Sequence, residues 1–174
     1  HWVHEGGISS PLIAHWPAKI PQNLNGTLIN QYGFLPDIMA TLVDISGATY
    51  SLQQDREPGP NMVGKSLTPL LEGKNIPIHD QPIFWEHEGN KAVRLGDFKA
   101  VMKWQDRKGK VQSWELYNIQ NDRTEQHNLA SEMPGKLETL TSAWQQWADS
   151  HDVLPWPQML DSLRANEGKM KALK

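Results

Sequence analysis

The feature that most constrains the fold is a change to period-two alternation after Pro82. Short apolar runs follow one another over residues 83–86, 91–95, 99–104 and 111–117. They are separated by Gly89-Asn90, Gly96-Asp97 and Lys108-Gly109-Lys110, which are typical of tight turns. This pattern predicts a four-stranded antiparallel meander.

Two helices are predicted by apolar residues that recur every three or four positions. The first covers residues 36–46, with Pro36 in its first turn and Gly47 as its C-terminal cap. The second begins after Ser131 and ends before Pro-Trp-Pro at 155–157, and its apolar positions are Leu137, Leu140, Trp144, Trp147 and His151. Residues 161–174 are polar and are expected to be a frayed helix or disordered. One meander packed with one long helix gives an α+β architecture.

The N-terminal part lacks partners for the elements that it predicts. Residues 8–16 form an apolar run after Gly6-Gly7, which disfavours a helix, and predict a short buried strand. Residues 50–74 are rich in proline and glycine and predict an irregular connection with one helical turn. A single strand followed by one helix cannot complete a sheet. We therefore expect residues 1–75 to be the end of a larger domain and residues 76–174 to be a separate small subdomain.

Composition excludes several classes of function. The chain carries 17 basic and 20 acidic residues, a net charge of -3, so it has no basic excess for binding a nucleic acid. No run approaches the roughly 20 apolar residues that span a bilayer, which predicts no membrane insertion. With no cysteine, the chain has no thiol nucleophile, disulfide or Cys-ligated zinc. Residues 1–7 resemble no signal peptide, and we expect the chain to be internal to a longer one.

Two clusters of polar residues could carry chemistry. His1, His4 and Glu5 have residue types that bind metals, but Gly6-Gly7 interrupts the helix that such spacing needs, so no metal site is predicted. Residues 86–90, Glu-His-Glu-Gly-Asn, place one imidazole between two carboxylates on a predicted hairpin turn. This turn either presents His87 to a ligand or is polar only for solubility. No nucleophile elbow or phosphate-binding loop occurs.

The chain is rich in tryptophan, with eight residues against three Phe and three Tyr. Five of them lie at strand or helix spacing and could form either a carbohydrate-binding platform or core: Trp104, Trp114, Trp144, Trp147 and Trp156. Core packing is the commoner use of such spacing.

Five segments, in order, resemble the sulfatase family. Residues 4–20 are similar to its Glu-Gly-Gly-x-x-x-Pro element with a following Trp-Pro, and residues 36–48 to its Asp-x-x-Pro-Thr-Leu helix, with Ala40 where proline is frequent. The other matches are the Gly-x-Ser-Leu-x-Pro-Leu-Leu element at 64–74, Trp-Glu-His-x-Gly-Asn with Arg-x-Gly-x-x-Lys at 83–101, and Trp-Glu-Leu-Tyr with Asp-x-x-Glu-x-x-Asn-Leu at 114–130.

The resemblance implies the C-terminal region of an arylsulfatase-like sulfuric ester hydrolase. Its small antiparallel sheet and terminal helix would pack on an alkaline-phosphatase-like α/β domain, whose end is residues 1–75. The family uses a formylglycine nucleophile, made in a Cys/Ser-x-Pro-x-Arg motif, and calcium. Neither the motif nor the calcium ligands are expected in this chain, so we expect it to bind no calcium and to be inactive alone.

The resemblance also assigns the candidate substrate-binding residues. The sulfate-binding Lys of the family corresponds to a position just before His1, which places His4 and Glu5 at the rim of the active site. The hairpin resembles a loop that the small subdomain lends to the substrate pocket, which makes His87 and Asn90 the remaining candidates. No catalytic residue is predicted within the chain.

Two other functions remain open. The tryptophan-rich sheet could be a non-catalytic module that binds a sulfated glycan, or the parent protein could hydrolyse phosphate or phosphonate esters. The family resemblance also implies export to the periplasm or outside the cell, and a sulfated small molecule or glycan as the substrate. An apolar surface left uncovered by the missing domain is expected to favour self-association of the chain.

Overall fold

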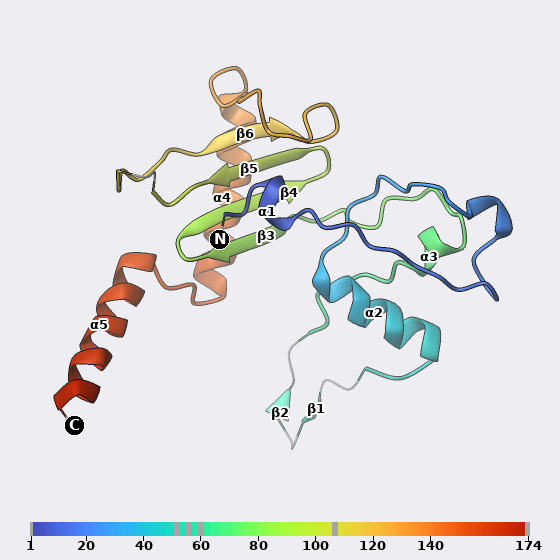
Figure 1. The fold of residues 1–174 in the computed structure, drawn as a ribbon, viewed down its shortest axis with the longest axis horizontal. Helices are drawn as coiled ribbons and strands as arrows, with labels where there is room; N and C mark the ends of the chain where they lie inside the picture. The colour runs from blue at the N-terminus through green and yellow to red at the C-terminus, as the bar shows by residue number, and fades with distance from the viewer. Residues whose placement is uncertain (1, 51–52, 55–56, 59–60, 106–107, 173–174) are drawn as a thin grey trace. The chain divides into compact units, whose positions relative to one another are not determined.

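The computed structural model describes residues 2–50, 53–54, 57–58, 61–105 and 108–172. This part of the chain divides into two compact units. The sheet unit consists of residues 1–10 and 82–174, and the loop unit consists of residues 11–81 (Figure 1). Residues 1–10 thus belong with the sheet, although the prediction grouped them with residues 11–75. The assignment of residues 11–75 to a larger domain stays a prediction.

The sheet unit contains the predicted meander. Its strands are β3 (Ile83–His87), β4 (Asn90–Leu95), β5 (Phe98–Met102) and β6 (Glu115–Asn118), hydrogen-bonded in the order β3-β4-β5-β6. Every neighbouring pair is antiparallel, with Phe84 opposite Val93 and Ala100 opposite Leu116. The α+β prediction and the meander are confirmed.

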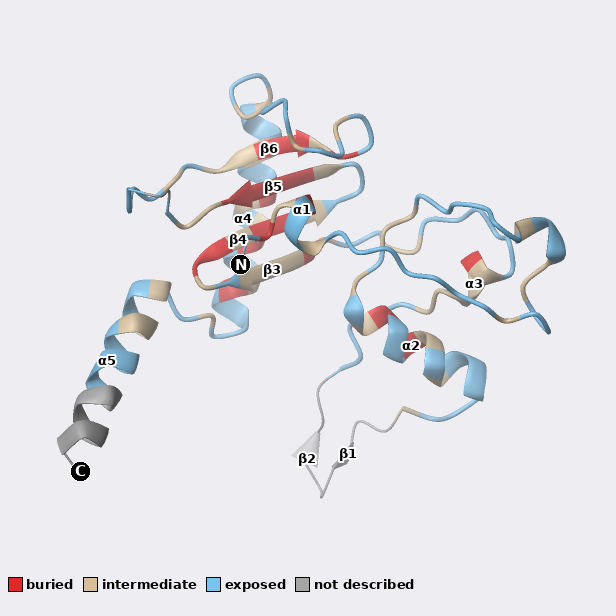
Figure 2. Cartoon of the chain, in the orientation of Figure 1, coloured by how far each residue is buried: buried red, intermediate tan, exposed pale blue. Residues whose placement is uncertain are grey.

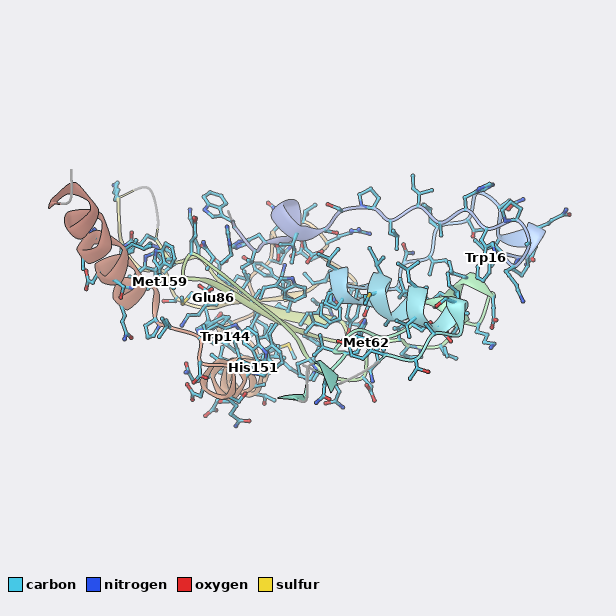
Figure 3. All side chains as sticks on the ribbon, turned by 90° about the horizontal axis from the view of Figure 1, so that it is seen from below. Trp16, Met62, Glu86, Trp144, His151 and Met159 are labelled. Carbon is cyan, nitrogen blue, oxygen red and sulfur yellow. The ribbon has the colours of Figure 1, made fainter. Side chains whose placement is uncertain are left out.

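Each face of this sheet is covered by a different segment, as Figures 1 and 3 show. Helix α4 (Pro134–Ser150) packs on one face, where the buried core residues are Val93, Ala100, Leu116, Leu140, Trp144 and Ala148. The N-terminal segment packs on the other face, where Val3, Ala92, Val101, Tyr117 and Ile119 form a second buried cluster. The predicted long helix is confirmed, although it begins at Pro134 rather than just after Ser131, because proline suits the first helical turn.

The tryptophans divide between core and surface. Trp144 is buried in the core, and Trp114 and Trp147 pack partly buried against it.

The C-terminal tail forms a further helix. Pro-Trp-Pro at 155–157 follows the end of α4, and α5 (Trp156–Ala172) begins within it. The tail is therefore helical where described, which agrees with the helical alternative of the prediction.

The predicted strand at residues 8–16 is wrong. No strand is present there among the described residues, and Ile13 is 90% exposed. A strand needs a hydrogen-bonding neighbour, and none of the described strands pairs with this segment. Gly6-Gly7 also fails to prevent a helix, because α1 (Glu5–Ile8) forms a single helical turn there. A Cβ on Gly7 would lie 2.1 Å from the Trp2 carbonyl oxygen, so this close approach requires glycine.

The loop unit contains the predicted first helix, α2 (Leu35–Ser46), and a largely irregular chain. Gly47 ends α2 in the left-handed conformation, with φ of 66°, as the sequence predicts. The expected helical turn within residues 50–74 is α3 (Thr68–Leu71), and the remaining elements are η1 (Gln22–Leu24), β1 (Gln53–Gln54) and β2 (Glu57–Pro58). No described helix of the chain is both long and apolar enough to cross a membrane.

Helix α2 exposes its apolar stripe and buries a carboxylate. Its exposed apolar side chains are Leu35, Ile38, Met39, Leu42 and Ile45, and Figure 2 shows most of the helix as exposed. Asp37, by contrast, has no exposed surface. Its carboxylate accepts hydrogen bonds from the backbone N–H groups of Phe34, at 2.9 Å, and Lys65, at 2.8 Å. It also lies 2.7 Å from Nε2 of His79. A buried polar centre therefore organises this unit.

Candidate functional site

A buried ion cluster joins the N-terminal segment to the sheet. The Nζ of Lys99, on β5, lies 2.8 Å from Oε1 of Glu5 and 2.9 Å from Oε1 of Glu125. The Lys99 side chain has no exposed surface, and the two carboxylates are 10% and 4% exposed. A lysine ammonium in such a place needs opposite charges at contact distance, because it has lost its hydration.

Glu125 also fixes the short helix α1. Its Oε2 accepts a 2.7 Å hydrogen bond from the backbone N–H of Glu5, so one carboxylate bridges the start of α1 and the lysine. The backbone of Glu125 is left-handed, with φ of 55°, which is uncommon for a residue other than glycine. The predicted candidate Glu5 thus has its carboxylate engaged in a buried ion pair.

His4 contacts a neighbouring carboxylate on β6. Its Nε2 lies 3.1 Å from Oε2 of Glu115. The hydrogen bond with His4 lowers the pKa of Glu115, against the opposing effect of burial. Burial and the nearby Glu115 carboxylate raise the pKa of the Tyr117 phenol. The Nδ1 of His4 is buried and has no hydrogen-bond partner among the described residues.

The other two candidates lie at the β3–β4 hairpin. His87 ends β3 and is exposed, which suits a side chain that meets a ligand. Asn90 is buried, and its amide donates to the His87 carbonyl at 2.9 Å while its Oδ1 accepts from the Trp104 backbone N–H at 3.0 Å. Asn90 therefore shapes the turn that presents His87.

The structure places the candidates at two locations on the sheet unit. His87 ends the outer strand β3, whereas His4 contacts Glu115 at the start of β6, and β4 and β5 lie between these strands. No group of three or more His, Asp or Glu side chains that could hold a metal ion occurs in the described ranges. The carboxylates of Glu5 and Glu115 are instead engaged in an ion pair with Lys99 and a hydrogen bond with His4.

Sequence reasoning did not single out Lys99 and Glu125 as part of this cluster. Both stand in segments that carried the family resemblance, at the Lys of Arg-x-Gly-x-x-Lys and the Glu of Asp-x-x-Glu. Lys99 is also the charged residue of the otherwise apolar strand β5. Such a residue is rarely buried unless it is paired, but its partner, Glu5, lies 94 residues away in the sequence.

Comparison with known proteins identifies one family. The family model described as "N-sulphoglucosamine sulphohydrolase, C-terminal" matches residues 1–148. An uncharacterized sulfatase of Schizosaccharomyces pombe is 27% identical over 183 residues, which cover 99% of this chain and 30% of the relative. N-acetylgalactosamine-6-sulfatase of Canis lupus familiaris is 32% identical over 99 residues, which cover 55% of this chain and 16% of the relative.

Among solved structures, that of Ps i-CgsB aligns with 64% of this chain and 23% of its own chain, at a TM-score of 0.48 and 22% identity. The chain thus spans less than a third of the length of each of these known proteins.

Replacing Lys99 by methionine is expected to lower the free energy of unfolding by about 3–5 kcal/mol, because two buried carboxylates lose their counter-charge. Urea unfolding at neutral pH measures the change. Adding Glu5→Gln and Glu125→Gln to Lys99→Met should recover most of the loss. Lys103→Met is the matched control: this lysine lies over the Trp2 ring, 3.7 Å from its centroid, and should cost about 1 kcal/mol or less. Equal losses of unfolding free energy in Lys99→Met and Lys103→Met would contradict a stabilising role for the ion cluster.

The contact between His4 and Glu115 should make stability depend on pH in acid. Because the folded-state pKa of Glu115 lies below its ordinary value of 4.5, this group stabilises the fold above that pH. The contribution is lost as the pH falls through the lowered pKa. His4→Phe should therefore flatten the dependence of the urea midpoint on pH below 4.5.

Asp122 also has a lowered pKa, held by the backbone N–H groups of Gln126 and His127, and contributes equally to wild type and variant. Identical pH slopes for wild type and His4→Phe would contradict the assignment.

Proposed function

The chain belongs to the sulfatase family described as N-sulphoglucosamine sulphohydrolase, C-terminal, and on that premise we propose that the whole protein hydrolyses sulfate esters of aryl compounds or carbohydrates. The observation that carries the proposal is the family match over residues 1–148. Because the chain spans only 30% of its S. pombe relative, the activity belongs to a larger protein than these residues.

In this proposal the chain completes the substrate pocket and does not perform the chemistry. It contains no cysteine and no Ser-x-Pro-x-Arg sequence, so the formylglycine nucleophile would come from another part of the protein. Calcium would likewise be held elsewhere in the protein, as the family resemblance implies. The buried carboxylates of Glu5 and Glu125 already neutralise Lys99 and are not available for proton transfer. The chain alone is therefore expected to be inactive.

The exposed face of α2 supports the presence of a covering partner. Its apolar side chains recur at the spacing of a buried helix face, yet Leu35 is 80% exposed. We assign this face to contact with the rest of the parent enzyme, because an exposed apolar stripe of this kind is costly in water. The isolated chain would then associate with itself through the same face.

His87 is the side chain proposed to meet the substrate, by a hydrogen bond to the leaving group or to a sugar hydroxyl. Its exposure at the end of β3 and the support of the turn by Asn90 favour this role. His4 and Glu5 would shape the rim of the active site from the second location, where His4 contacts Glu115 and Glu5 contacts Lys99.

Export to the periplasm or outside the cell is part of the proposal, and fractionation of the producing cells tests it.

The whole protein is expected to release sulfate from 4-nitrophenyl sulfate or from N-acetylgalactosamine 6-sulfate. Ion chromatography of the released anion measures this, and residues 1–174 alone are expected to release none. 4-Nitrophenyl phosphate is the control substrate. Faster release of phosphate than of sulfate would overturn the proposal in favour of a phosphate ester hydrolase.

Substitution of His87 by alanine in the whole protein is expected to raise KM for the sulfated sugar about tenfold, the effect of losing one hydrogen bond to the substrate. Folding should be retained because the side chain is exposed. His127→Ala is the matched control, since the His127 side chain is 83% exposed elsewhere in the sheet unit. An unchanged KM in His87→Ala would remove this residue from the substrate pocket.

A further inference from the structure

A small pocket lies beside the β3–β4 hairpin, on the face of the sheet that α4 covers. Its volume is about 120 Å³, and all its lining residues belong to the sheet unit. The residues that line it include Glu86, Lys91, Trp104, Trp144, Gln145 and Trp156. In Figure 3, Glu86 and Trp144 are labelled at this end of the sheet, near the first turns of α5.

Two of the tryptophans are placed there by local constraints other than core packing. Trp104 and Trp156 are half-buried, and neither belongs to the core cluster under α4. Gly89, with φ of 81°, lies against both: a Cβ at this position would be 2.8 Å from the Trp104 ring and 3.0 Å from Cβ of Trp156. The backbone N–H of Trp104 is held by Asn90. The hairpin turn thus lies against both half-buried tryptophans, which line the same pocket.

Opposite charges converge on the same pocket. The Nζ of Lys91 lies 4.3 Å from the centroid of the Trp144 ring, and Oε1 of Glu86 accepts a hydrogen bond from the backbone N–H of Gly89 at 2.8 Å. Burial lowers the pKa of Lys91, against the opposing effect of Glu86. Lys91 and Glu86 are directly opposite each other in the antiparallel pair, so both side chains point to this face.

We propose that this pocket binds one pyranose ring of a saccharide. The half-buried side chains of Trp104 and Trp156 offer apolar ring surface that suits the C–H face of a sugar. The carboxylate of Glu86 would accept hydrogen bonds from its hydroxyls, and the ammonium of Lys91 would donate to them. A pocket that offers both signs of charge together with indole rings matches a hydroxylated ring better than a purely apolar or an anionic ligand.

The pocket and His87 serve different sugar units. Side chains alternate along β3, so Glu86 and His87 point to opposite faces of the sheet. The sugar in the pocket is therefore not the one that His87 would contact, and the substrate would be an oligosaccharide that spans the hairpin. This conclusion about the substrate rests on the proposed sulfatase function.

Calorimetric titration of the whole protein with unsulfated tetrasaccharides built on galactose and on N-acetylgalactosamine tests the pocket. Trp156→Ala is expected to weaken binding about tenfold, the usual order for loss of one stacked aromatic ring. Gln145→Trp should have the same effect by filling the pocket. Gln146→Trp is its matched control, because Gln146 is the next exposed residue of α4 and does not line the pocket.

Saccharide binding at the pocket would be contradicted by equal affinities of the Gln145→Trp and Gln146→Trp proteins, or by no binding of either tetrasaccharide to wild type. Either result would count even where sulfate release is observed. Binding that depends on Trp156 and Gln145, without release of sulfate from any ester, would support the saccharide site and contradict the proposed hydrolysis. Circular dichroism of each variant verifies that the loss is not one of folding.

Discussion

The sheet unit depends on the buried ammonium of Lys99. It stands in the second inner strand of the meander, and it is neutralised by Glu5 from the N-terminal segment and Glu125 from the loop after β6. A lysine and two carboxylates would each be costly to bury alone, so the three can be buried only together. The cluster thereby fixes where residues 2–10 lie on the sheet, although 94 residues separate Glu5 from Lys99 along the chain. An apolar contact would have fixed this position less specifically, because it lacks direction.

The loop unit follows the same logic. Ala40 and Leu70 are its buried apolar side chains among the described residues, so it has little core of its own. The Asp37 carboxylate takes the place of an apolar core. Its hydrogen bonds connect the start of α2, the backbone N–H of Lys65 and the His79 ring. Asp37, Lys99 and Glu125 all stand in segments that resemble the sulfatase family. In this chain those polar positions stabilise the fold, which explains why similarity in these segments identifies a family without locating its catalytic groups.

Local patterns explain what could be predicted. The meander and helices α2 and α4 depend on alternation, helical spacing and caps that lie within each segment, and they formed as expected. The strand prediction for residues 8–16 was wrong because an apolar run indicates only that a segment is to be buried. A strand also needs a hydrogen-bonded neighbouring strand. The exposed stripe of α2 has the same cause, since periodicity predicts a buried face without its partner. The ion cluster could not be predicted because it depends on residues that only the completed fold brings together. The hydrogen bonds of Asn90 with His87 and Trp104 likewise depend on the folded hairpin and its neighbouring strand.

The β3–β4 hairpin connects these structural facts to recognition. Its turn is determined by Asn90, which bonds to both His87 and Trp104, and by Gly89, which leaves room for the indole rings. Strand alternation then directs His87 to one face and Glu86 to the other. A two-residue turn is too short to change this division, so any ligand that contacts both side chains must extend around the end of the hairpin. A small aryl sulfate cannot do so, whereas a chain of sugars can. Under the proposals made above for the pocket and for His87, one ligand that reaches both faces of the hairpin is therefore an oligosaccharide.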